Sequence, residues 1–316
     1  MKQFLGKAVQ FLLTDFLFLS PILLVIFVGS ALFWREKLSK LWQRIGLVLI
    51  VLILLLTIWG VHIERNLIVI NEQRITLGFK ARIVVISDVH LGIWKDDKFL
   101  RKIVTQINQQ SDIDAVLMAG DWTYEPNIDQ LDKLFAPLKQ LKYPIYGVLG
   151  NHDVEKPGPK LRTELQSALQ KANVKLIDNL ALESKDTGLN FDIIGLGDLM
   201  GSEDDVDVIS NRTSQNHSIV IAHNPESLLK YKNIPKNKNL PNLTVTGHTH
   251  CGQVRIPLVY KSFLPVKNTD FDKGLFNTSQ FDPTLAGQLW ISCGTGEVGL
   301  PIRLFNPPSI DVLSID

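Results

Sequence analysis

The sequence predicts an α/β domain that follows a two-helix membrane anchor. Two observations predict this division. Long uncharged apolar segments occupy the first fifth of the chain, whereas beyond residue 80 short apolar runs of strand length alternate with amphipathic helical patterns. We therefore expect a transmembrane helical hairpin in residues 1–63, a connector in 64–80 and the α/β domain in 81–316.

The anchor is predicted from two segments, Phe16–Trp34 and Ile45–Val61, neither of which contains a charged residue. A membrane span needs roughly 20 apolar residues, with about 17 as the lower limit. A buried core helix and a cleaved signal peptide are the alternatives. An almost purely aliphatic run has no polar face for water, and the apolar region of a signal peptide is shorter. We therefore expect two membrane spans.

The charges around the spans predict a topology for a two-pass protein of the inner membrane. The loop between the spans carries four basic residues and one acidic residue: Arg35, Lys37, Lys40 and Arg44 against Glu36. Short basic loops remain cytoplasmic, which would place the domain on the extracytoplasmic side. The opposite orientation has support from basic residues outside the spans: Lys2, Lys7, Arg65, Arg74, Lys80 and Arg82.

The amino-acid composition limits the classes of molecule that this protein is expected to bind. The net charge is +1 and the pI is about 7.8, so no basic surface for nucleic acid is indicated. Two cysteines, Cys251 and Cys293, are too few for a disulfide framework. A single bridge between them is an open alternative that their spacing does not indicate. The sequence predicts no oligomeric state.

Eight apolar runs have the length and the Val/Ile content of buried strands. They are Ile83–Ser87, Ala115–Ala119, Ile145–Leu149, Phe191–Leu196, Ile219–Ala222, Leu243–Thr246, Leu289–Ser292 and Ile310–Ile315. Helical patterns lie between the early runs, at Asp97–Gln109, Ile128–Leu141 and Leu161–Ala172. The alternating residues of Ile63–Lys80 suit an edge strand. Strands that alternate with helices indicate an α/β domain.

Polar side chains follow five of these runs. The segments are Asp88-Val89-His90, Gly120-Asp121, Gly150-Asn151-His152-Asp153, Ala222-His223 and Gly247-His248-Thr249-His250. Ligands bind at strand ends in α/β sheets, and imidazole and carboxylate suit Mn, Fe and Zn. Asp88 and His90 are separated by one residue, as are His248 and His250. An extended strand would direct both side chains of such a pair to the same side. Each motif alone is an ordinary turn, but five in order predict a metal site. His62 and His217 lack this context, and we interpret them as structural or solvated.

This order of motifs resembles that of the calcineurin-like metallophosphoesterases, over residues 81–316. The resemblance implies a four-layer sandwich of two mixed sheets flanked by helices, with two divalent metal ions, either Mn, Fe or Zn. It implies one metal held by Asp88, His90 and His250, a second held by Asn151, His223 and His248, and Asp121 as the bridge between them. It also implies that His152 stabilises the phosphoryl oxygens or protonates the leaving group. Asp153 would then orient the His152 imidazole.

The C-terminal segments resemble the bacterial membrane-associated branch of this family. They are Gly247–Pro257, Ser292–Gly296 and Leu300–Arg303. Two positions depart from that branch, because Cys251 stands where Gly is usual and Cys293 where Arg is frequent. The second departure removes a candidate phosphate contact. We interpret Cys251 as a small packed residue that is not a metal ligand.

Together these features predict a metal-dependent phosphoesterase whose substrate is lipid-linked or belongs to the cell envelope. Two alternatives are open: a UDP-2,3-diacylglucosamine pyrophosphohydrolase of lipid A synthesis, which needs a cytoplasmic site, and a non-catalytic metal-binding scaffold. The apolar segment Leu258–Val266 is equally compatible with a lipid-facing lip and with a buried hairpin.

Overall fold

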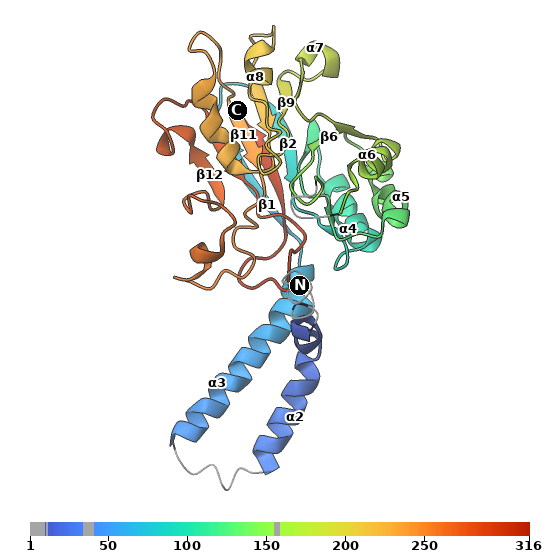
Figure 1. Cartoon of the computed structure of the whole chain (residues 1–316), viewed down its shortest axis with the longest axis vertical. Helices are drawn as coiled ribbons and strands as arrows, with labels where there is room; N and C mark the ends of the chain where they lie inside the picture. Colours follow the sequence, from blue (N-terminus) through green and yellow to red (C-terminus); the bar gives the residue numbers. More distant parts are fainter. Residues whose placement is uncertain (1–9, 11, 34–40, 155–158) are drawn as a thin grey trace.

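The computed structural model describes residues 10, 12–33, 41–154 and 159–316. Helices α2 (Ser20–Phe33) and α3 (Leu41–Ile58) project together from one end of a domain that contains two large sheets (Figure 1). N-terminal helices and a domain with two sheets are therefore both present, as the sequence predicts.

Helix α3 continues through a π-helical turn, η2 (Trp59–Ile63), and a 3-10 turn, η3 (Glu64–Asn66). The resulting helix, Arg44–Asn66, has 23 residues and is long and apolar enough to cross a membrane. The helical segments Leu12–Phe18 and Ser20–Ser30 qualify only as a bent pair, with an angle of 63° between them. Length and composition thus give one candidate span, or two if the bent pair is a single span.

The apolar side chains of the hairpin have little cover within the described chain. Only 11% of the apolar window of the long helix is buried, and Val25 and Val48 are 73% and 65% exposed. Full burial of one such side chain is favourable by about 1.5–3 kcal/mol. The long helix is therefore not a core helix of this domain, and its surface suits an apolar environment.

The first sheet has the strand order β1-β14-β2-β4-β6-β7. The strands are β1 (Val69–Ile75), β14 (Ser309–Ile315), β2 (Ala81–Ile86), β4 (Ala115–Ala119), β6 (Ile145–Val148) and β7 (Val174–Leu176). All neighbours are parallel except β14 and β2. The edge strand expected before residue 80 exists as β1, so part of the predicted connector belongs to this sheet.

The second sheet has the order β12-β13-β11-β10-β9-β8. Its strands are β12 (Gly274–Asn277), β13 (Gln288–Ile291), β11 (Leu243–Thr246), β10 (Ser218–Ile221), β9 (Asp192–Gly195) and β8 (Leu180–Leu182). The four central strands are parallel and the two outer strands are antiparallel to them. Short strands β3 (Leu91–Gly92) and β5 (Thr123–Tyr124) form a separate pair. Both large sheets are therefore mixed.

Successive residues of β2 show how the two sheets are packed. Ile83 and Val85 belong to the apolar core between the sheets, whereas Val84 and Ile86 belong to the core under the helices of the first sheet. A strand that is buried on both faces reads as a continuous apolar run, which is why these strands were visible in the sequence. A third core lies between the second sheet and its covering segments.

Helix α4 (Asp97–Asn108) covers the first sheet and agrees with the predicted helix to within one residue. The Asp96 carboxylate caps it by accepting the backbone N–H groups of Lys98 and Phe99, each at 3.1 Å. Helix α6 (Arg162–Lys171) likewise confirms the third predicted helix.

The helical pattern predicted at Ile128–Leu141 is confirmed only in part, because it is not one continuous α-helix. The structure has a 3-10 turn η4 (Ile128–Gln130), a short α5 (Leu131–Phe135) and a 3-10 helix η5 (Ala136–Gln140). Pro137 is the physical reason, because proline has no N–H group for the helical ladder and clashes with the preceding turn.

Five short helical elements follow β8. They are α7 (Ser184–Thr187), α8 (Asp207–Asn211), η6 (Pro225–Asn233), η7 (Tyr260–Phe263) and η8 (Thr278–Gln280). The segment Leu258–Val266 contains η7 and exposes Leu258 and Phe263. Its interpretation as a buried hairpin is therefore wrong.

Candidate metal centre

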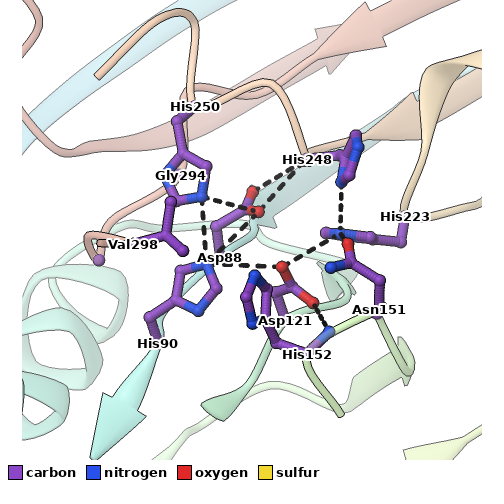
Figure 2. A network of polar contacts seen from close by, with 12 residues as sticks. Asp88, His90, Asp121, Asn151, His152, His223, His248, His250, Gly294 and Val298 are labelled. Carbon is purple, nitrogen blue, oxygen red and sulfur yellow. Dashed lines mark hydrogen bonds and ion pairs between the residues drawn. The ribbon is translucent and has the colours of Figure 1, made fainter. Parts of the chain in front are cut away.

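The predicted ligands meet where the two sheets come together. Asp88, Asp121 and Asn151 follow strands of the first sheet, and His223 and His248 follow strands of the second (Figure 2). All five side chains are buried. Since parallel strands direct their carboxyl ends to one edge, the topology collects residues that are far apart in sequence.

The backbone at these strand ends is left-handed rather than extended. The φ angles are 48° at Asp88, 45° at His90, 55° at Asp121, 68° at His248 and 47° at His250. The extended backbone expected for the pairs Asp88/His90 and His248/His250 is therefore wrong, although both members of each pair do face the site. Such φ values in non-glycine residues cost roughly 1–3 kcal/mol each and concentrate at functional sites.

Two glycines permit the strand-end loops to approach each other. A Cβ atom at Gly150 would lie 2.2 Å from Asp121 Oδ1, and one at Gly247 would lie 2.3 Å from Asp88 Oδ2. Any side chain at these positions would displace a carboxylate of the site. The close approach, rather than the turn alone, explains these glycines.

One cluster of potential metal ligands consists of Asp88, His90 and His250. His250 Nε2 lies 3.1 Å from His90 Nε2 and 3.5 Å from Asp88 Oδ1. His90 Nε2 lies 4.0 Å from the same carboxylate oxygen. The three atoms thus converge on one point.

The second cluster overlaps the first through Asp88 and adds Asp121 and His223. Asp121 Oδ2 lies 3.2 Å from His223 Nε2 and 3.5 Å from His90 Nε2. His223 Nε2 in turn lies 3.0 Å from Asn151 Oδ1 and 3.1 Å from the Nδ1 atom of His248. The Asp121 carboxylate therefore lies between the two groups of donors.

Three of the imidazoles contact a backbone carbonyl through one ring nitrogen. Nδ1 of His90 is 3.2 Å from the Thr123 carbonyl, and Nδ1 of His223 is 2.9 Å from that of Ala119. Nε2 of His248 is 2.9 Å from the Pro265 carbonyl. Each carbonyl accepts a hydrogen bond from the ring N–H group, which directs the lone pair of the remaining nitrogen into the site, as is usual for metal-binding histidines.

The protonation states also suit metal binding. Burial lowers the pKa of His90 and of His248 to about 3 and holds the pKa of His250 well below its usual value. Burial opposes the ionisation of Asp121, but His223 and His90 outweigh it and hold the pKa of Asp121 well below its usual range. Neutral imidazoles and a carboxylate are the forms that bind cations.

His223 differs from the other three histidines, because a positive charge on it is stabilised by the Asp121 carboxylate. Its burial lowers the pKa, but the Asp121 carboxylate outweighs burial and raises the pKa to about 10. The proton on His223 therefore balances the charge of the Asp121 carboxylate at a position that suits a metal cation. Nitrogen and oxygen donors that face one another within 4.8 Å, all buried, fit a pair of overlapping sites for divalent cations.

Residues 81–252, more than half of the chain, match the sequence profile of the family described as calcineurin-like phosphoesterase. The chain belongs to this family. It is a metal-dependent phosphoesterase with a buried His/Asp metal site. Its two mixed sheets flanked by helices agree with the fold that the sequence resemblance implied.

Three relatives are similar to this phosphoesterase. An uncharacterised metallophosphoesterase of Campylobacter jejuni is 28% identical over 74% of this chain, and the match spans 59% of that protein's length. An uncharacterised metallophosphoesterase of Bacillus subtilis, YkuE, is 27% identical over 80% of this chain and 85% of its own. The UDP-2,3-diacylglucosamine pyrophosphatase LpxG of Chlamydia muridarum is 25% identical over 81% of this chain and 92% of its own.

In this phosphoesterase, the contacts of Asp153 differ from those predicted. Its Oδ1 accepts from the backbone N–H and the hydroxyl of Thr123, at 3.1 and 2.9 Å. Its Oδ2 accepts from the N–H groups of Trp122 and Gly150, both at 3.0 Å. Four donors fill the acceptor positions of a carboxylate, so Asp153 joins two ligand loops.

His152 lies at the edge of the metal centre. Its backbone N–H donates to Asp121 Oδ1 at 3.0 Å. Its ring centroid is 5.1 Å from that of His90 and 5.3 Å from that of Tyr124 (Figure 2). The side chain is only partly buried, which suits a group that meets substrate.

Cys251 is packed in the interior and lies outside the two ligand clusters of the described residues, but it is not a free thiol. A disulfide joins Cys251 to Cys293 across 42 residues of sequence. It links the loop that carries His250 to the loop after β13, where a Cβ atom at Gly294 would lie 2.7 Å from Asp88 Cβ. The bridge therefore connects two loops that pack around one metal cluster.

Sequence reasoning missed a buried arginine that supports the same loop. Arg303 is fully buried and donates to the carbonyls of Cys293 at 3.0 Å and Gly296 at 2.7 Å. Nearby, Asn306 Nδ2 donates to the His250 carbonyl at 2.7 Å. The only signal in the sequence was the position of Arg303 in a C-terminal segment with family character.

The two histidines set aside in the sequence lie outside the metal centre. His217 stacks on Phe79 with a centroid separation of 4.7 Å, and His62 lies 6.0 Å from Phe18. Neither belongs to the two ligand clusters of the described residues.

Proposed function

We propose that this phosphoesterase is anchored in a membrane and hydrolyses a phosphoester that is lipid-linked or belongs to the cell envelope. The observation that carries the proposal is the union of a buried metal centre with an exposed apolar hairpin in one molecule (Figure 1). An anchored site meets substrates at the bilayer surface rather than in solution.

The proposed ligand assignment follows the two groups of converging donors. Asp88, His90 and His250 would hold one cation, Asn151, His223 and His248 would hold the other, and the carboxylate of Asp121 would be available to both. When bound, two such cations neutralise phosphoryl charge and lower the pKa of a bound water. His152 donates a hydrogen bond to the phosphoryl oxygens or a proton to the leaving group.

The proposed orientation has the domain on the extracytoplasmic side. Disulfides persist in oxidising compartments and are rare in the cytosol of mesophiles, so the Cys251–Cys293 bridge supports this side. The basic loop residues Arg35, Lys37 and Lys40, on which the sequence prediction relied, lie outside the described residues.

Reporter fusions after Asp316 test the orientation. We expect a reporter that is active only outside the cytoplasm to report activity, and one that is active only inside to remain silent. The reverse pair of results would contradict the outward orientation.

The second candidate is a UDP-2,3-diacylglucosamine pyrophosphohydrolase. The named Chlamydia relative, similar over 81% of this chain, favours it. This reaction needs a cytoplasmic domain because its substrate is made there, and the disulfide therefore favours the first candidate.

A substrate and metal assay of the full chain in detergent tests both candidates. Metal content is measured first, then hydrolysis of a nitrophenyl phosphodiester, a lipid phosphoester and the diacylated nucleotide sugar. We expect chelation to remove activity and Mn or Zn to restore it. His248→Ala should lose metal, whereas the control His62→Ala, distant from both clusters, should retain it. Turnover confined to the nucleotide sugar would select the second candidate.

A further inference from the structure

An apolar cavity of about 490 Å³ lies directly beside the metal centre. It is lined by Thr249 and His250 and by the apolar side chains of Val254, Ile256, Val259, Phe263 and Val298. Figure 2 shows Val298 on the same side of the metal centre as His250. One of the proposed metal ligands, His250, therefore also lines the cavity.

The wall of this cavity continues to the base of the hairpin. Gly299, the residue after Val298, accepts a hydrogen bond from Gln10 Nε2 at 2.6 Å. The Arg303 N–H donates to the Gly60 carbonyl at 3.2 Å, at the domain end of the long helix. The segment that follows Val298 in the cavity wall thus contacts the N-terminal helical part at two points.

Large apolar side chains are exposed in the loop that supplies much of the cavity lining. Leu258 is fully exposed and Phe263 is 79% exposed. Exposed apolar surface of this kind indicates a contact with a partner or with a membrane. Since these residues adjoin a cavity that continues to the hairpin, the lipid surface is the environment they fit.

The few polar side chains of the cavity are already engaged within the protein. The Thr249 hydroxyl donates to the Asp272 carbonyl at 3.0 Å. Gln253 Nε2 donates to the Leu300 carbonyl at 2.9 Å, and its Oε1 accepts from the Val298 N–H at 2.9 Å. A sugar or a nucleotide base would find few hydrogen-bond partners here, whereas a hydrocarbon chain requires none.

We propose that this cavity binds an acyl chain of a membrane lipid and thereby brings the phosphoester of that lipid to the metal centre. This inference rests on the proposed function, because it assigns a substrate class to the same site. Binding energy from a remote part of the substrate then positions the reacting phosphate.

Two neighbouring substitutions form a matched test. Val259→Trp fills part of the cavity, whereas Leu258→Trp adds the same indole at a residue that does not line it. Each variant of the full chain is assayed in detergent micelles with two nitrophenyl phosphodiesters. One carries a methyl group as its second ester and the other a long-chain diacylglycerol, so the leaving group is the same.

We expect Val259→Trp to lower kcat/KM for the diacylglycerol ester about tenfold or more, as poor fit in an apolar pocket does. The methyl ester should be unaffected, and Leu258→Trp should resemble the unmodified chain with both substrates. An equal fall with both substrates, or an equal fall in both variants, would overturn the acyl-chain site. The acyl-chain site would also be overturned if the unmodified chain did not prefer the diacylglycerol ester to the methyl ester. Failure of the unmodified chain to hydrolyse either ester would instead contradict the proposed function.

Discussion

The metal centre and the apolar loop beside it, residues 252–266, differ in almost every physical property. The centre is buried and polar, and its side chains follow strands of two sheets. The apolar loop is exposed at Leu258 and Phe263 and contains a single short 3-10 helix. Rigid strands hold the groups that perform chemistry, while a surface loop meets the environment that supplies the substrate. Substitutions in the two regions should therefore have different consequences.

The largest effect is expected at Asp121, whose carboxylate lies between both groups of donors. Asp121→Ala should abolish hydrolysis of every ester and release metal, because two close cations would repel each other without the anion between them. Metal analysis and a turnover assay measure this. Asp129→Ala, at an exposed position, serves as the control. Normal metal content together with full activity in Asp121→Ala would refute the assignment.

His152 should affect turnover without affecting metal. We expect His152→Ala to retain its metal and to lose roughly 10²–10⁴-fold in kcat, as general acids and bases typically contribute. The loss should be smaller for a nitrophenyl ester, since a good leaving group needs no proton. A loss of metal as large as that of His248→Ala would make His152 a ligand instead.

Metal affinity should depend on pH through His223. In the metal-free protein the Asp121 carboxylate raises the pKa of His223 to about 10, so a cation must displace a proton at neutral pH. The apparent affinity should therefore rise by up to about tenfold per pH unit as the pH increases towards that value. Competition titrations at several pH values measure it, and calorimetry in two buffers of different ionisation enthalpy counts the released protons. Affinity that does not change with pH would contradict the proton at His223.

The disulfide joins the two regions, because Cys251 directly precedes the apolar loop and follows His250. Replacing both cysteines by serine should lower the free energy of unfolding by about 2–4 kcal/mol, which is typical for bridges that close loops of this kind. Denaturant titration measures the change. A reductant should have the same effect on the unmodified chain and none on the double variant. Equal stability of oxidised and reduced protein would argue against the bridge.

The metal centre was predictable from the sequence because its two signals are local. A strand buried on both faces, such as β4, is a continuous apolar run, and Asp121 follows it within two residues. The order of the polar motifs along the chain was then enough to predict that they meet at one edge of the sheets. The break in the predicted helix at Pro137 was also readable, since proline ends helices by a local mechanism.

Other features depend on how distant segments meet. Nothing in the spacing of Cys251 and Cys293 indicates that their loops adjoin. The donors to Asp153 come partly from Trp122 and Thr123, residues on another loop. The exposure of the apolar loop likewise follows from what lies beside it, because an apolar composition is the same in a core and on a membrane surface.

The smallest effect is expected in the apolar loop itself, at Phe263. Phe263→Ser should leave metal content and turnover of a soluble methyl ester unchanged, because the side chain is 79% exposed and does not belong to the ligand clusters. Turnover of a long-chain lipid ester should fall by about tenfold, which corresponds to the loss of roughly 1.5 kcal/mol of apolar contact. Parallel assays of the two esters measure this, with Met200→Ser as a control because Met200 is also an exposed apolar residue but does not line the cavity. A similar loss in the control would mean that general surface apolarity, and not this loop, determines access to lipid. A loss of soluble-ester turnover would mean that the apolar loop and the metal centre are one structural unit, and their separation into two regions would then fail.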